Sequence, residues 1–358
     1  MRLITDWFKR TFSDPQVVFL VVALGGGLAV ILTLGHMLAP VLASAVIAYL
    51  LEGLVNITRR SGLPRLIAVI IVFVLFMVFV TLVIFGLLPM LSRQVTELVG
   101  QLPAMITQGQ QALMALPERY PDVLSFEQAQ QIIDAIKREI AGFGQQVVSM
   151  SLDSVVGVIT ILVYLILMPL LVFFFLKDKD AIIGWFTQFL PQDRMFANQV
   201  WRDVDRQIAN YVRGKFWEIL VVWFASLMAF TYFGLQYAML LAVLVGLSVI
   251  IPYIGATVVT FPVLLVAWFQ WGWGPDFVWL MAAYLVIQAL DGNVLVPLLF
   301  SEVVNLHPVA IIVAILVFGG LWGFWGVFFA IPLATLVNAV LNAWPGRDRG
   351  GPTTEAQP

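Results

Sequence analysis

The sequence contains no cysteine and only two histidines among its 358 residues. A disulfide framework and a thiolate zinc site are therefore excluded, and two histidines cannot complete a zinc site without carboxylates. The chain also lacks an HExxH sequence, a lysine-containing phosphate-binding loop, a glycine-rich dinucleotide fingerprint and a Ser–His–Asp spacing. We therefore expect no cofactor, no metal site and no enzymatic activity, and we do not expect ATP to drive this chain.

Charge is also scarce. Charged residues make up 11% of the chain and hydrophobic residues 61%, whereas a soluble domain carries roughly a quarter charged residues. The formal net charge is −2, and basic residues do not form a patch with aromatic residues away from the apolar runs, so we expect no nucleic-acid partner. The polar surface is too small to face water, so we predict an integral membrane protein.

Long segments without any charge support this prediction, because a helix needs about 20 apolar residues to cross roughly 30 Å of hydrocarbon. Three of these segments are too long for one crossing and must contain breaks or hairpins. We predict an all-α membrane fold of about eight transmembrane helices with broken or re-entrant segments. Six crossings are the alternative if residues 239–271 or 299–320 re-enter. The charge-free segments are 15–51, 66–92, 154–176, 219–275 and 303–346.

Basic residues predict which side of the membrane each loop occupies, because cytoplasmic loops are enriched in Lys and Arg. Such residues precede the first span, follow the second, occur repeatedly in 177–215 and return in the tail. We therefore predict a multi-pass protein of the bacterial inner membrane with both termini in the cytoplasm. The first two spans are expected at 17–34 and 40–57, with the uncharged sequence GHMLAP (35–40) as an outer turn.

Residues 92–150 are polar and rich in glutamine, and they should lie outside the cytoplasm. Their apolar residues recur at alternating steps of three and four, which is a heptad pattern. Pro103 should kink or restart the first helix. The stripes either bury against each other in a helical hairpin or form a coiled coil between subunits, and we expect a homo-oligomer. The two stripes are Leu91, Val95, Leu98, Leu102, Met105 and Ala112, and Phe126, Ala129, Ile133, Ile136, Ile140, Phe143 and Val147.

A second polar segment follows the fourth span. Its apolar stripe, Ala197, Trp201, Val204, Ile208 and Tyr211, lies beside arginines. This pattern is typical of a helix in the headgroup plane, and a packed loop helix is the alternative. The expected organisation is N-terminal transmembrane helices (1–91), an extracytoplasmic helical insert (92–150), a fourth transmembrane helix (151–177), a cytoplasmic amphipathic segment (178–215), a C-terminal transmembrane domain (216–345) and a disordered tail (346–358).

One acidic residue interrupts the apolar span at 277–298. The sequence QALDGN (288–293) contains Gln288, Asp291 and Asn293 in apolar surroundings. On a helix Gln288 and Asp291 share a face. A carboxylate there costs about 2.5 to 3.5 kcal/mol on the insertion scale, so it usually faces a cavity or a partner. We interpret the three residues as part of a substrate or ion pathway; alternatively, Asp291 only bonds a neighbouring helix.

Two predicted helix breaks flank this acidic span, at IPYIGA (251–256) and at 297–308. Unwound backbone exposes carbonyls and helix ends that can bind ions or substrate, although prolines also kink purely structural helices. The candidate pathway residues at these breaks are Pro252, Tyr253, Gly255 and Pro297.

Other ionisable residues have weaker signals. His307 and Glu302 form a candidate proton relay, but a histidine before a proline also commonly caps a helix. Glu52 and Glu218 occur at the ends of predicted spans, so we expect both to lie at the membrane interface.

Four segments resemble the AI-2E family of transporters, within it the PerM-type permeases. The resemblance covers nearly the whole chain by layout, and it implies a bacterial inner-membrane secondary transporter. Family members have been associated with export of autoinducer-2 and, in another branch, with sodium- or lithium-proton antiport. The family's binding residues are not carried over. The segments are YVRGK (211–215), IPYIGA (251–256), QALDGNVLVPLLFSEVVNLHP (288–308) and FGGLWGFWGVFFAIPLATL (318–336).

Together these features predict a secondary transporter that moves a small solute or ion by alternating access past Asp291 and the two breaks. A change in the charge of Asp291 would couple transport to a proton or cation. The expected partners are membrane lipid and a small-molecule or ion substrate. The alternative is a membrane scaffold that recruits partners through residues 92–150.

Overall fold

The computed structural model describes residues 15–115, 117, 125–131, 133–135, 138, 154–188, 195–252, 254–300 and 307–343. These residues form helices and short turns, and none of them lies in a strand. The predicted all-α fold is therefore confirmed. In the described part of the chain, five helices are long and apolar enough to cross a membrane, and further apolar helices are shorter. The five are Met37–Arg60, Arg65–Met114, Gln207–Phe233, Ile254–Trp271 and Pro275–Leu299.

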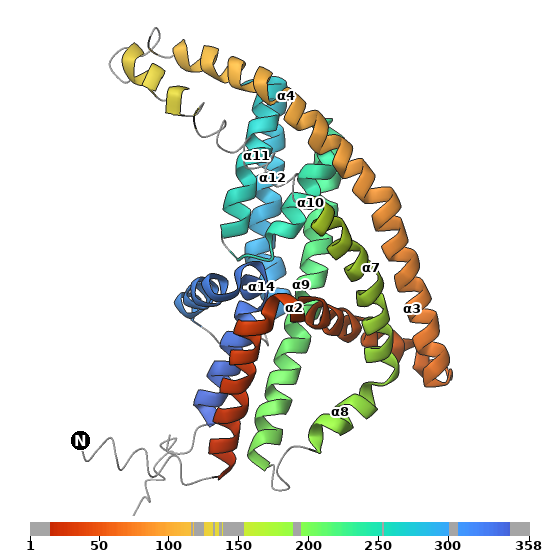
Figure 1. Cartoon of the computed structure of the whole chain (residues 1–358). Coiled ribbons are helices and arrows are strands. Elements are labelled where there is room, and N and C mark those ends of the chain that lie inside the picture. The colour runs from red at the N-terminus through yellow and green to blue at the C-terminus, as the bar shows by residue number, and fades with distance from the viewer. Residues whose placement is uncertain are drawn as a thin grey trace, which may run out of the picture.

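The predicted outer turn at 35–40 is wrong, because helix α2 runs without interruption from Pro15 to Arg60. Figure 1 shows α2 as two arms that meet at an angle. Pro40 lies inside the helix, and an internal proline removes a backbone hydrogen bond and bends the axis. The Ser44 hydroxyl lies 2.6 Å from the Pro40 carbonyl and 3.2 Å from that of Met168, so packing against the helix of Met168 holds the bent segment.

Ion pairs join α2 to the starts of α3 (Arg65–Leu82) and α8 (Lys179–Thr187), and Arg65 donates a hydrogen bond of 3.3 Å to the Leu176 carbonyl near the end of α7 (Ser154–Lys177). Arg65 lies 2.6 Å from a carboxylate oxygen of Asp180 and 3.8 Å from Glu52, and Lys179 lies 3.4 Å from the same Glu52 oxygen. Glu52 therefore sits in a charged cluster with the first residues of α3 and α8, and its place at the membrane interface stays a prediction.

The segment after α3 continues as a single helix. A π-helical turn, η1 (Val83–Leu87), leads into α4 (Leu88–Met114), so Arg65–Met114 forms one 50-residue helix. The helix does not restart at Pro103, because α4 passes through it, and the kink expected there stays a prediction. The predicted boundary at residue 91 lies inside α4.

The apolar stripe of α4 packs against the C-terminal half of the chain. Four residues of this stripe contact the main apolar cluster, which is formed mainly by helices of the C-terminal half. They are Leu91, Leu98, Leu102 and Met105. Gln94 accepts a hydrogen bond of 2.8 Å from the Leu240 backbone amide. In the downstream stripe Ala129 and Ile133 are buried and Phe126 is exposed, and Ile136, Ile140, Phe143 and Val147 lie outside the described residues.

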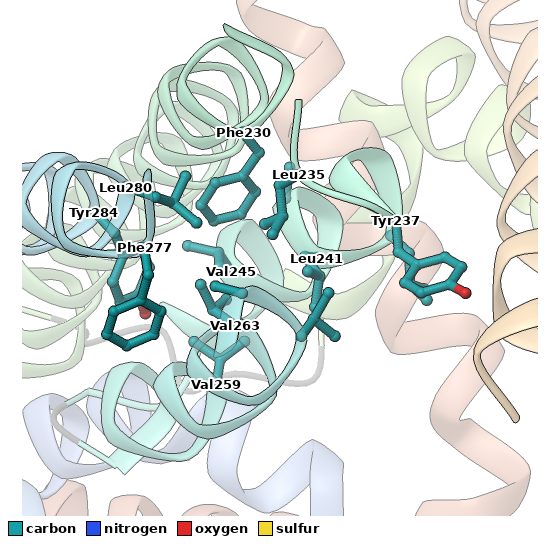
Figure 2. Packing of buried hydrophobic residues seen from close by; sticks show 14 of the residues in the cluster. Phe230, Leu235, Tyr237, Leu241, Val245, Val259, Val263, Phe277, Leu280 and Tyr284 are labelled. Atoms are coloured by element: carbon teal, nitrogen blue, oxygen red, sulfur yellow. The ribbon is translucent and has the colours of Figure 1, made fainter. Parts of the chain in front are cut away.

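That main cluster forms where α9 (Met195–Phe233), α10 (Ala238–Ser248), α11 (Ile254–Trp271) and α12 (Pro275–Leu290) meet. Figure 2 shows Phe230 of α9, Val245 of α10, Val263 of α11 and Tyr284 of α12 pointing into it. The predicted cytoplasmic helix 197–211 is the first part of α9, where Tyr211 is 2% exposed and Ile208 packs on a second apolar cluster. These two residues favour the packed alternative.

Helices α10 and α11 form a hairpin. At its open end, the side chain of Gln270, near the end of α11, makes two hydrogen bonds of 2.8 Å. It accepts one from the Gln236 backbone amide and donates one to the Gly234 carbonyl. At its tip, a Cβ on Gly255 would collide with the carbonyl of Ser248, so α11 begins directly against the end of α10. Both ends of the segment lie together, which favours the re-entrant alternative for 239–271.

The last apolar run is also divided. Helix α14 (Pro308–Ala343) is kinked at Gly323, whose φ of 59° is in the left-handed region. The kink leaves two shorter apolar helices, Val309–Gly323 and Gly326–Asn338. A side chain at Gly326 would collide with the Phe318 carbonyl. Close backbone packing across the kink therefore requires glycine at this position.

We predict that Gly326→Ala lowers the stability of the folded protein by about 2 kcal/mol, because the added methyl has only backbone to displace. Gly320→Ala is the matched control, since a methyl group added there would have no atom within 4 Å. The midpoint temperature at which purified protein loses its monodisperse size-exclusion peak measures the effect. Equal midpoints for both variants would show that the kink is not closely packed.

Candidate functional site

A buried ion pair lies on α9. Nζ of Lys215 is 2.7 Å from Oε2 of Glu218, and the two side chains are 7% and 2% exposed. The spacing of three residues places both on one face of the helix. The Glu218 side chain is buried by neighbouring helices, and its location at the membrane interface stays a prediction. Helix α9 is 39 residues long, so Glu218 lies in its interior and not at its start.

The Lys215 ammonium also donates a hydrogen bond of 2.7 Å to the Val249 carbonyl. Val249 follows the last residue of α10, at the tip of the hairpin. The break predicted at IPYIGA is thus confirmed, with Pro252 in the turn and Gly255 buried in the first turn of α11. Tyr253 lies outside the described residues. The exposed carbonyl at this break binds a side chain of the same protein.

Asp291 lies in a π-helical turn, η2 (Asp291–Leu295), which continues α12 into α13 (Val296–Phe300). Its Oδ1 is buried and has no hydrogen-bond partner among the described residues. Lys215 is the cation that acts on Asp291 electrostatically, and Glu218 acts on it as a like charge. The π turn that carries Asp291 packs against α9, the helix that carries Lys215 and Glu218. Isolated π turns inside α-helices occur frequently at functional sites.

The other two residues of the acidic motif have local partners. The Gln288 side-chain amide donates a hydrogen bond of 2.7 Å to the Tyr284 hydroxyl. That hydroxyl lies 2.9 Å from the Thr260 hydroxyl on α11. Gln288 therefore belongs to a buried polar chain that connects α11 and α12. The Asn293 side-chain amide donates a hydrogen bond of 2.8 Å to the Ala289 carbonyl one turn earlier. It is therefore hydrogen-bonded within its own helix.

The structure describes only the two ends of the second predicted break, residues 297–300 and 307–308. Pro297 lies inside α13, which continues to Phe300 without interruption, and Glu302 lies outside the described residues. His307 is exposed and precedes α14. Nδ1 of His307 accepts a hydrogen bond of 3.3 Å from the Val309 amide. The His307 carbonyl accepts one of 2.8 Å from the Ala310 amide. These bonds are those of a helix cap, the alternative considered for this histidine.

A cavity of about 1190 Å³ lies elsewhere, between α2, α3, α7 and α9. None of the predicted pathway residues that the structure describes lines it. The site therefore consists of one ammonium, two carboxylates and the carbonyl at the hairpin tip. Within the described ranges no three His, Asp or Glu side chains gather as a metal site would require. A group of charges that can change partner or protonation is suited to binding a cation or proton.

These features define an α-helical membrane protein in which half-length helices end beside a buried cluster of charges. A family model described as "AI-2E family transporter" matches residues 17–346. "Putative permease PerM" of Escherichia coli (strain K12) is 47% identical over 345 residues, which cover 96% of this chain and 98% of the relative. "Putative transport protein YueF" of Bacillus subtilis (strain 168) is 26% identical over 306 residues, covering 84% and 82%.

The chain belongs to the AI-2E transporter family, as the resemblance of its motifs indicated. The names of these relatives describe a permease and a transport protein, and they support a role in membrane transport. Together with the long apolar helices, the family indicates a protein embedded in a membrane.

We predict that Lys215→Met destabilises the protein by about 3 to 5 kcal/mol, because it leaves the Glu218 carboxylate buried without its cation. The double variant Lys215→Met/Glu218→Met should recover most of that loss, since an apolar pair of similar volume removes both charges. Heat-stability midpoints of the two single variants and the double variant measure the coupling. Losses that simply add in the double variant would mean that the two side chains do not stabilise each other.

Proposed function

We propose that this protein is a secondary transporter that moves a small solute or ion across the bacterial inner membrane without ATP. The observation that carries this proposal is the unpartnered Oδ1 of Asp291, buried beside an ion pair at the tip of a hairpin. A carboxylate retained in such apolar surroundings usually serves a pathway or a coupling step. Helix breaks that expose backbone at the same place are typical of transporter binding sites.

In the proposed mechanism, Lys215 exchanges between carboxylates. In one state it is paired with Glu218, and a proton or cation neutralises Asp291. When that ion leaves, Asp291 attracts the ammonium, and the contact between Lys215 and the Val249 carbonyl breaks. Because this carbonyl is at the hairpin tip, the exchange would move the α10–α11 hairpin against α9. Alternating access then follows from rocking of the hairpin around the charged cluster.

The scaffold alternative is less well supported. It requires the apolar stripes of residues 92–150 to be available to partners, but Leu91, Leu98, Leu102 and Met105 pack on the chain's own cluster. We keep the homo-oligomer as a proposal, with exposed Phe126 as the described residue of the downstream stripe that is available to a second copy, since Ala129 and Ile133 are buried within the chain. Native mass spectrometry in a mild detergent tests it, and a purely monomeric spectrum would remove the coiled-coil contact.

We predict that residues 92–150 are extracytoplasmic and 178–215 cytoplasmic, with both termini on the cytoplasmic side, because basic loops remain inside. The chain has no cysteine of its own, so Gln111→Cys and Gln188→Cys, at two exposed positions, provide unique labels. A membrane-impermeant maleimide should label the first in intact spheroplasts and the second only after lysis. The reverse pattern would invert the proposed topology.

We predict that Asp291→Asn retains folding but loses at least about 90% of the flux or its pH dependence, because the amide keeps the shape and removes the charge. Asp276→Asn is the control, since Asp276 is an exposed aspartate in the first turn of the same helix. Proteoliposomes tested with inorganic cations and small polar metabolites identify the solute, and its flux is compared between variants. A folded Asp291→Asn protein with unchanged flux and pH dependence would make Asp291 structural.

A further inference from the structure

The cavity between α2, α3, α7 and α9 has a volume of about 1190 Å³. This exceeds the roughly 300 to 1,000 Å³ of common small-molecule sites. Its walls are mostly aliphatic and aromatic, with Leu75 and Phe79 on α3, Leu165 on α7 and Trp217 on α9. A small polar solute would leave most of these walls without a partner. The cavity therefore requires an occupant with a large apolar part.

Two arginines, Arg60 on α2 and Arg213 on α9, also line this cavity. No aspartate or glutamate appears among its described lining residues. Within the described ranges, Arg60 has no ion-pair or hydrogen-bond partner. Nε of Arg213 donates a hydrogen bond of 3.2 Å to the Ala209 carbonyl, and its guanidinium interacts electrostatically with Tyr49. The charge of the cavity is therefore positive and is not neutralised by an acidic side chain that lines it.

We propose that this cavity binds one anionic phospholipid, with its phosphate held by Arg60 and Arg213 and its acyl chains along the apolar walls. Basic pockets between transmembrane helices bind anionic lipid headgroups in this way, and arginine donors match the oxygens of a phosphate. The bound lipid would fill the space that separates α9 from the α2–α3–α7 group. This proposal does not depend on the transported solute or on Asp291.

Native mass spectrometry of the full chain in a mild detergent tests the proposal. The protein is incubated with phosphatidylglycerol and phosphatidylethanolamine of identical acyl chains. We expect one retained phosphatidylglycerol per chain and at least a fivefold preference for it. Arg60→Gln/Arg213→Gln should reduce that preference to near one. Arg59→Gln should keep it, because the neighbouring Arg59 does not line the cavity.

A second variant tests the apolar part. Leu75→Trp partly fills the cavity, so it should reduce retention of both lipids by a similar factor. Equal retention of the two lipids by the original chain would overturn the proposal, as would a preference that the double arginine variant keeps. A dimer mass without bound lipid would show instead that a second copy of the chain fills the cavity. Transport can be unaffected in all of these variants, so the result is independent of the proposed coupling role of Asp291.

Discussion

The ammonium group of Lys215 is the constraint on which the described site depends. A charge removed from water costs several kcal/mol unless nearby groups compensate it. Glu218 supplies the opposite charge and Val249 a carbonyl oxygen, both at 2.7 Å. In a continuous helix the Val249 carbonyl would accept from the amide four residues later, so it is available only because α10 ends. The helix break and the buried ion pair therefore require each other.

The same dependence explains why half-length helices occur on one side of α9. Eleven residues of α10 extend about 16 Å, roughly half of the hydrocarbon thickness. A helix that ends at this depth must give its terminal carbonyls partners from another element, since lipid offers none. Lys215 does this for the α10–α11 hairpin. The π turn at Asp291 brings a second carboxylate to the same side chain, which links α12 to the hairpin through electrostatics.

Much of the fold was predictable from local signals. Charge-free length predicted the apolar helices, and Pro252 with Gly255 predicted the break that forms the hairpin tip. The turn expected at 35–40 failed because glycine and proline mark a turn only when the chain leaves the helix, and here packing around Pro40 keeps it helical. A break in 303–346 was expected from its length, but its position was missed because the run is apolar throughout, and only the positive φ of Gly323 shows where it divides.

The site was predictable in part. Asp291 was identified from its isolation in an apolar span, which reflects a local cost. Lys215 and Glu218 were missed as a site because they lie at the end of a basic segment, where charges normally face the interface. Their spacing of three residues was the available signal, since such a pair shares one helix face. Whether that face is buried depends on α10, more than twenty residues later in the sequence, and no local pattern contains this information.

The most direct test of the account is whether the two ends of the α10–α11 segment lie on the same side of the membrane. Gln236 precedes α10 and Trp273 follows α11, and both are exposed. Single cysteines at these positions, labelled with an impermeant maleimide in sealed vesicles, report the side of each end. A re-entrant hairpin predicts that both are labelled from the same side. Labelling from opposite sides would mean that the segment crosses, and Lys215 would then have no hairpin tip to bind.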